Sequence, residues 1–143
     1  MKKHASAHWQ GNLKQGKGTI STESGALKNN PYGFNTRFED APGTNPEELI
    51  GAAHAGCFSM AFSMLLGEEG YTPDNIDTKA SVTLDKVEDG FAVTAVHLVM
   101  QAKIPTIDQA AFEAIANKAK AGCPISKLLK ADVTLDATLT AGG

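Results

Sequence analysis

The stretch NPEELIGAAHAGCF, which begins at Asn45, constrains the fold most, because it joins a clear helix start to a run of very small residues. Asn45 is a favourable N-cap and Pro46 suits the first helical position. Glu48 stands where its carboxylate can complete a capping box, whereas Glu47 has no part in that box and is favoured there only by the helix dipole. We predict a helix from Pro46 to Leu66.

The small residues of this helix, which include Gly51 and Gly56, leave much of its backbone bare. Glycine inside a helix costs about 1 kcal/mol relative to alanine, so a close approach of another helix or a sheet must offset the cost. Cys57 in such a helix is either a small buried hydrophobe or a reactive thiol, and its spacing does not decide between them. His54, three residues earlier on the same face, is more simply a packing histidine than a base acting on the thiol.

The length, charge and composition of the chain favour one soluble domain over residues 1–143. The chain has 143 residues, a formal net charge of −3 and scattered rather than clustered cations, which argues against nucleic acid as a partner. We find no apolar leader after MKKHASAHWQG and no stretch that approaches the length of a membrane span. These features predict a cytoplasmic protein with no membrane partner.

Cysteine and histidine usage indicates neither a disulfide scaffold nor a metal site. The two cysteines, Cys57 and Cys123, lie far apart, and neither belongs to a CxxC motif. The four histidines show no ligand spacing such as HxxxH. We therefore expect no metal and no organic cofactor.

The remaining pattern predicts an α+β fold with antiparallel sheets around the long helix. We expect short strands before the helix, a hairpin and a helix after it, then a short helix and a last strand; the ranges are Ala7–Trp9, Gly18–Thr22, Tyr32–Thr36, Thr78–Val87, Phe91–Lys103, Gln109–Ala121, Pro124–Lys130 and Asp132–Thr140. Asp108 is the expected N-cap of the helix from Gln109. Cys123 precedes Pro124 and so stands at the next helix start, where unpaired amides favour a thiolate.

Four stretches together resemble the OsmC branch of the OsmC/Ohr family. They are PYGFNTRFE from Pro31, GTNPEELIGAAHAGCFSMA from Gly43, VTLDKVEDGFAVT from Val82 and KAKAGCPISKLLKADVTLD from Lys118. A cysteine ten residues after the first glutamate of NPEEL, combined with a distant AGCP, is a specific combination.

The resemblance implies a thiol-dependent peroxidase that prefers organic hydroperoxides, on an intertwined homodimer with two equivalent sites. By motif position Cys57 resembles the peroxidatic cysteine and Cys123 the resolving one. Arg37 resembles the arginine that stabilises the thiolate, and Glu47 the carboxylate that orients this arginine. An external dithiol is then the expected reductant.

Physical chemistry is consistent with these implied roles. A thiol reduces peroxides only as a thiolate, and a buried Cys57 needs a cation that burial does not neutralise, which an arginine provides. Glu47 and Cys57 on one continuous helix are about 15 Å apart along its axis. Either the helix breaks or the residues come from different subunits, and we favour Arg37 and Glu47 of one subunit completing the site of the other. An apolar wall would come from residues such as Phe34, Phe58, Met60 or Phe62, although core positions are the better interpretation of these residues.

Three other interpretations use the same cysteines. The chain could be a thiol–disulfide exchanger, although a cysteine among small buried residues suits a protein substrate poorly. It could be a non-enzymatic stress protein that binds a small apolar ligand at a dimer interface. The pair could also form an inert stabilising disulfide, which a cytoplasmic setting disfavours.

Overall fold

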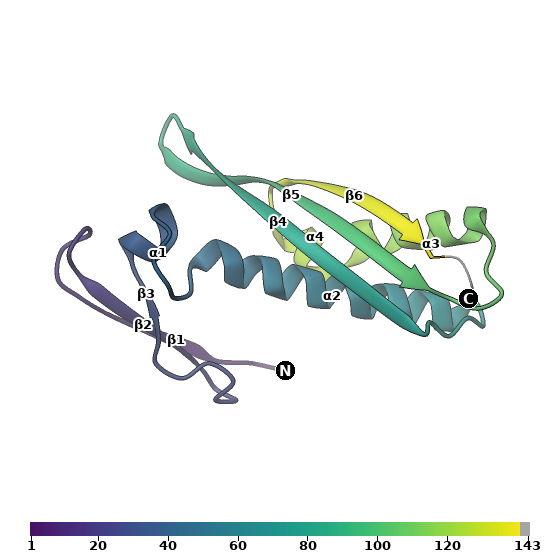
Figure 1. Cartoon of the computed structure of the whole chain (residues 1–143), viewed down its shortest axis with the longest axis horizontal. Coiled ribbons are helices and arrows are strands. Elements are labelled where there is room, and N and C mark those ends of the chain that lie inside the picture. The colour runs from purple at the N-terminus through teal and green to yellow at the C-terminus, as the bar shows by residue number, and fades with distance from the viewer. Residues whose placement is uncertain (141–143) are drawn as a thin grey trace. The chain divides into compact units, whose positions relative to one another are not determined.

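The computed structural model describes residues 1–140 and confirms the α+β class. Strands and helices follow one another in the order β1, β2, β3, α1, α2, β4, β5, α3, α4, β6 (Figure 1). By their internal contacts the residues divide into two compact units, one from Met1 to Leu49 and one that begins at Ile50. Each unit is described by itself, and a single domain over residues 1–143 stays a prediction.

The first unit is an antiparallel sheet in the order β1-β2-β3, with strands Ala5–Gln10, Lys17–Thr22 and Asn30–Tyr32. The expected strand over Tyr32–Thr36 is wrong beyond its first residue. A short helix, α1, takes its place at Phe34–Phe38. The Thr36 hydroxyl accepts a hydrogen bond from the Gly33 N–H at 2.8 Å, and this local bond stabilises the turn that ends the strand.

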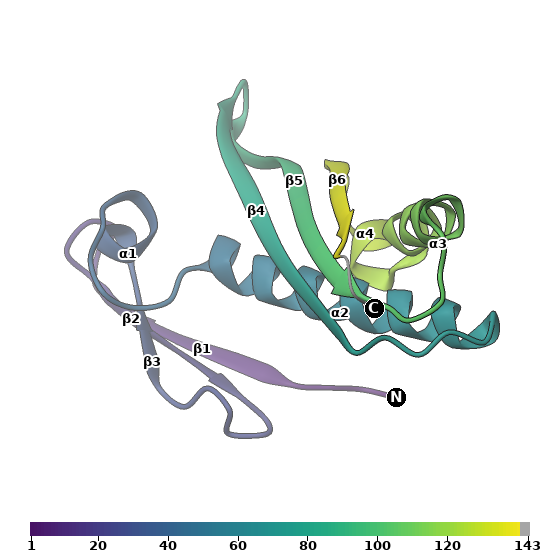
Figure 2. The same cartoon turned by 45° about the vertical axis from the view of Figure 1, so that its right-hand side comes forward.

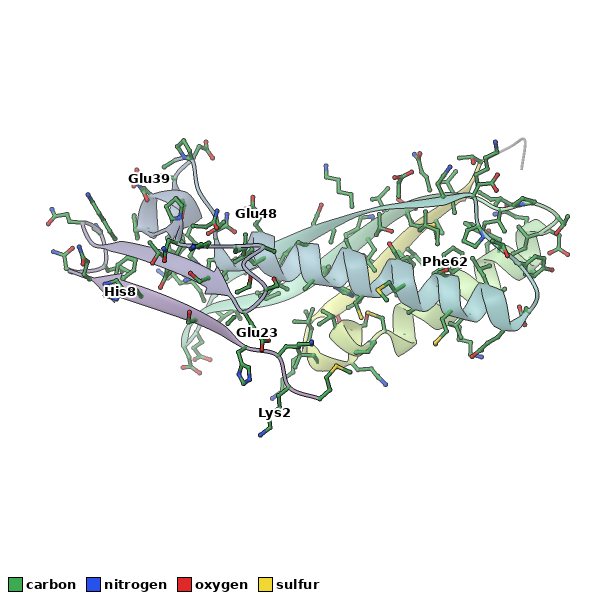
Figure 3. All side chains as sticks on the ribbon, turned by 90° about the horizontal axis from the view of Figure 1, so that it is seen from below. Lys2, His8, Glu23, Glu39, Glu48 and Phe62 are labelled. Atoms are coloured by element: carbon green, nitrogen blue, oxygen red, sulfur yellow. The ribbon has the colours of Figure 1, made fainter. Side chains whose placement is uncertain are left out.

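Helix α2 spans Pro46–Glu68, close to the predicted range. The Asn45 side chain accepts a hydrogen bond from the Glu48 N–H at 2.7 Å, as an N-cap should; Glu48 is labelled at the start of the helix in Figure 3. A Cβ on Gly51 would lie 3.4 Å from Val82, so the predicted close approach is made there by strand β4. Gly56 faces open space instead, since no neighbouring atom of residues 1–140 would come within 4 Å of a Cβ added to it.

By length and composition alone, α2 is apolar enough to cross a membrane. The expectation that no stretch approaches the length of a membrane span is therefore wrong for α2 taken by itself. The core helix of a soluble protein meets the same criterion, and α2 fully buries Phe58, Phe62 and Leu66 within the chain. The span criterion is thus weak support for a membrane location.

The second sheet has the order β4-β5-β6, with strands Asn75–Val87, Gly90–Lys103 and Asp132–Leu139. The β4–β5 hairpin is antiparallel as predicted. Strand β6 pairs in parallel with β5, so this sheet is mixed rather than wholly antiparallel. The parallel pairing requires a crossover, which helices α3 (Gln109–Gly122) and α4 (Pro124–Leu128) supply.

Both predicted helix starts in this crossover are confirmed. The Asp108 side chain accepts a hydrogen bond from the Ala111 N–H at 2.7 Å and caps α3. Cys123 is the N-cap residue of α4, with Pro124 directly after it.

The core of the second unit lies between its sheet and its helices. Alternate residues of β5 are fully buried on one face of the sheet, and α2, α3 and α4 cover this face (Figures 1 and 2). Phe62, labelled in Figure 3, stacks on Phe58 at 6.1 Å between ring centroids and meets the edge of Phe112 at 5.8 Å. This packing holds α2 against α3.

Candidate active site

Cys57 and Cys123 come together within the second unit. Cys57 lies on α2 and is partly exposed, whereas Cys123 is fully buried at the start of α4. Cys57 packs against the core cluster that contains Cys123. Cys123 and the Ile125 backbone both act on the pKa of the Cys57 thiol. Both cysteines are free thiols.

Burial has the largest effect on the Cys57 thiol and raises its pKa above the ordinary value. The Ile125 N–H acts in the opposite direction, because it stabilises the thiolate. The neighbouring Cys123 raises the pKa further, through its hydrogen bond and its charge. Among the groups of residues 1–140 that shift this pKa none is a cation, so the thiolate still needs one.

Arg37 and Glu47 form the second pair, within the first unit. The Arg37 Nε donates to Glu47 Oε1 at 3.0 Å and Nη2 donates to the same oxygen at 2.7 Å. Arg37 comes from α1, because the chain turns into a helix at Gly33 instead of continuing as a strand. Glu47 is in the first turn of α2, and its ion pair with Arg37 gives a partner to the acid that the expected capping box left without a role.

The guanidinium of Arg37 is fixed from two sides. Glu47 uses the edge that carries Nε and Nη2, and the Phe38 ring lies under the group at 5.4 Å from its centroid. The side chain of Arg37 is still 36% exposed, against 13% for Glu47. The edge that Glu47 does not use can therefore meet an anion or a polar substrate.

A small apolar cavity adjoins this arginine. Its volume is ≈ 80 Å³, and its walls are mainly aromatic, with Arg37 among the lining residues Trp9, Leu13, Tyr32, Phe34 and Phe38. Of the four residues considered for an apolar wall, Phe34 lines this cavity. Phe58 and Phe62 are fully buried in the core of the second unit, as the core interpretation predicts, and Met60 is 77% exposed.

The ring of His54 is buried, as expected of a packing histidine, and its Nε2 lies 2.7 Å from Ser126 Oγ. The ring is fully buried, and burial lowers the His54 pKa below 6.5. The spacing of His54 and Cys57 placed both on one face of α2, but Ser126 carried no signal of its own in the sequence.

No group of three or more His, Cys, Asp or Glu side chains within residues 1–140 could hold a metal ion.

Comparison with known proteins gives one consistent result. The family profile described as "OsmC-like protein" matches residues 38–138. The chain is 62% identical to "Peroxiredoxin OsmC" of Escherichia coli (strain K12) over 134 residues, which cover 94% of each chain. It is 31% identical to "Organic hydroperoxide resistance protein OhrB" of Bacillus subtilis (strain 168) over 117 residues, 81% of this chain and 84% of that protein.

A solved structure supports the fold. An OsmC-like protein of unknown function from Vibrio cholerae aligns with a TM-score of 0.78 at 18% identity, over 96% of this chain and 99% of that one.

Proposed function

This chain belongs to the OsmC-like protein family, and from that premise we propose that it is a cysteine-based peroxidase that reduces organic hydroperoxides to alcohols in stress defence. Relatives named peroxiredoxin and organic hydroperoxide resistance protein support the reaction class. The observation that carries the proposal is the packing of Cys57 against the core cluster that contains Cys123. Two cysteines that are 66 positions apart meet with no other cysteine in the chain.

The chemistry runs in three steps. The Cys57 thiolate attacks the terminal peroxide oxygen, the O–O bond breaks, and the alkoxide leaves as the alcohol after taking a proton. Cys57 is then a sulfenic acid, and Cys123 condenses with it to form the disulfide and water. An external dithiol reopens the disulfide through a mixed disulfide and returns both thiols.

In this proposal Arg37, held in place by Glu47, supplies the cation that the Cys57 thiolate needs. Because burial raises the Cys57 pKa, a fixed guanidinium near the sulfur is required for reaction at neutral pH. Glu47 holds one edge of the guanidinium, so the other edge can face the sulfur or the peroxide oxygen.

We propose that these two residues act on the cysteines of a second subunit in a homodimer. Glu47 and Cys57 lie ten residues apart on the continuous helix α2, which corresponds to about 15 Å along the axis. The exposed and apolar face of α2, with Gly56 in open space and Met60 77% exposed, is a surface that a second copy can cover. A fully active monomer on dilution would contradict this arrangement.

We attribute the proposed preference for organic hydroperoxides over hydrogen peroxide to the aromatic cavity beside Arg37. Burial of an alkyl group stabilises the complex by about 25 cal/mol per Å² of apolar surface, which hydrogen peroxide cannot gain. We further propose that the protein acts in the cytoplasm as a single domain over residues 1–143, without a metal or organic cofactor.

The test is a thiol count on reduced protein treated with cumene hydroperoxide or hydrogen peroxide. We expect wild type to lose both thiols, Cys57→Ser to keep its remaining thiol, and Cys123→Ser to stop at a sulfenic acid, with the organic peroxide faster. Survival of both thiols would favour the non-enzymatic protein that binds an apolar ligand. If the protein exchanges its thiols with protein disulfides and reacts with neither peroxide, the thiol–disulfide exchanger is favoured.

A further inference from the structure

Helices α2 and α4 meet through two neighbouring pairs of side chains. On α2, His54 and Cys57 are three residues apart, and on α4 Cys123 and Ser126 have the same spacing. His54 Nε2 contacts Ser126 Oγ at 2.7 Å. Cys57 packs against the core cluster that contains Cys123, and Cys123 acts on the pKa of the Cys57 thiol. Residues three apart on a helix lie about one turn from each other on the same face, so the two pairs are adjacent contacts of one helix–helix junction.

The hydrogen bond between His54 and Ser126 is costly to lose because the histidine ring is buried. His54 is fully buried, and within residues 1–140 its Nδ1 has no hydrogen-bond partner. Nε2 carries the proton and donates to Ser126, because the other tautomer would bury an N–H on Nδ1 without an acceptor, and orphaned donors are the rarer case. Ser126 is therefore the sole polar partner of this ring within the described residues.

Neither ring nitrogen of His54 hydrogen-bonds to the Cys57 sulfur within the described residues. The histidine does not contribute to the shift of the Cys57 pKa, and burial keeps the ring neutral at pH 7 by lowering its own pKa. What the hydrogen bond fixes is the position of α4, which has five residues and no buried side chain of its own. A helix this short depends on contacts from outside it.

We infer that His54 and Ser126 are positioning residues, which hold the start of α4 against α2 and so keep Cys123 within reach of the Cys57 sulfenic acid. This inference rests on the proposed function. In the step concerned, the sulfur of Cys123 bonds to that of Cys57, the S–O bond of the sulfenic acid breaks, and the thiol proton leaves with the hydroxyl group as water. Looser attachment of α4 slows this closure and leaves the first attack on peroxide unchanged.

The experiment compares the two steps in Ser126→Ala. Reduced protein is mixed with cumene hydroperoxide, quenched at set times, and assayed for sulfenic acid with dimedone and for disulfide by alkylation of the remaining thiols. We expect the sulfenic acid to form at the wild-type rate and to close about tenfold more slowly, as for one lost hydrogen bond to a buried partner. Excess peroxide should then convert more Cys57 to sulfinic acid, which mass spectrometry detects.

Two further variants test whether slower disulfide closure reflects lost positioning or general destabilisation. A third variant tests whether a partial loss of the hydrogen bond gives a smaller effect. Ser126→Thr keeps the hydroxyl and should restore the closure rate. Ser59→Ala removes a hydroxyl from α2 that also makes a 2.7 Å bond, to Thr78 of β4, and should leave closure unchanged. His54→Gln keeps an N–H donor and should slow closure less than Ser126→Ala does.

Each result has a distinct meaning. Wild type that keeps both thiols in peroxide overturns the proposed function and this inference together. Wild type that closes its disulfide, with Ser126→Ala closing equally fast, overturns only the role of the pair. Slowing of both steps by the same factor, or equal slowing in Ser59→Ala, also overturns it.

Discussion

Arg37 binds Glu47 along one edge of its guanidinium, with Nε at 3.0 Å and Nη2 at 2.7 Å from the same carboxylate oxygen. The pair joins α1 to the first turn of α2 and leaves the other edge of the arginine unused by Glu47. A partly exposed ion pair contributes only about 0–1 kcal/mol to stability, so its geometry is better explained by a functional role.

Arg37→Ala should therefore lower kcat/KM for cumene hydroperoxide about 100-fold, as loss of a preorganised donor does. Arg37→Lys should still lose roughly tenfold, since a point charge cannot bind Glu47 and the reacting group with separate edges. Steady-state kinetics and urea unfolding measure both effects, and we expect the unfolding free energy to change by less than about 1 kcal/mol. Lys14→Ala, which removes a nearby cation 5.9 Å from the Phe34 ring, is the matched control. Wild-type rates in Arg37→Lys would contradict the role.

The ionisation of Cys57 should depend on Arg37. Without the guanidinium, burial dominates and the Cys57 pKa rises, so fewer thiolates are present at pH 7 and the reaction slows. In a Cys123→Ser background, the pH midpoint of iodoacetamide alkylation should lie at least about 1 unit higher in Arg37→Ala than in its parent. Identical midpoints would show that Arg37 does not reach the sulfur.

Stability should fall in mild acid because of His54. Burial lowers the His54 pKa below 6.5, so in the folded state the ring stays neutral where the unfolded chain already binds a proton. The stabilisation is complete above pH 6.5 and is lost as the pH falls below this value toward the folded-state pKa. Urea midpoints at pH 7.5 and 5.5 should differ less in His54→Gln than in wild type. An unchanged difference would mean that another group causes the acid sensitivity.

The exposed face of α2 should control assembly. A Cβ added at Gly56 meets nothing within 4 Å in the described part of the chain, so we expect a leucine there to fold and to separate two helices that approach closely. We expect Gly56→Leu to weaken dimerisation at least about tenfold in sedimentation velocity, equivalent to roughly 1.4 kcal/mol. Ala114→Leu adds nearly the same bulk at an exposed position of α3 and should leave assembly unchanged. Equal dimerisation in both variants would remove α2 from the interface.

Phe62 should be a core residue and not a substrate contact. Its ring is fully buried between Phe58 and Phe112. Phe62→Ala should therefore lower the unfolding free energy by about 3–5 kcal/mol, and Phe62→Leu by less than about 1.5 kcal/mol. In Phe62→Leu the KM for cumene hydroperoxide should stay at the wild-type value. A raised KM with unchanged stability would favour the alternative, in which Phe62 lines the substrate pocket.

Local chemistry explains which elements were predictable. The start of α2 was readable because the cap, Asn45, and the first helical residue, Pro46, lie side by side in the sequence. The turn at Gly33 was missed because the residues after Tyr32 alternate as in a strand. Thr36, three positions after Gly33, was the available signal, since its hydroxyl can bond back to the Gly33 N–H.

Long-range contacts were beyond local reasoning. Spacing alone left Cys57 undecided, and only the family resemblance implied that Cys123 is its partner. Neither a helical pattern nor residue type pairs His54 with Ser126, because their contact depends on how α4 packs against α2. The parallel register of β6 on β5 is likewise set by the crossover between them.

That parallel strand has a consequence for synthesis of the chain. Strand β6 follows every other strand of residues 1–140, and it pairs with β5 only after α3 and α4 have been made. Because domains fold as their segments emerge, the edge of β5 stays open until β6 has been translated. Cys57 also leaves the ribosome well before Cys123, so a nascent chain carries the first thiol without the second. With the resolving role proposed for Cys123, protection against overoxidation begins only once the crossover that carries Cys123 has been added.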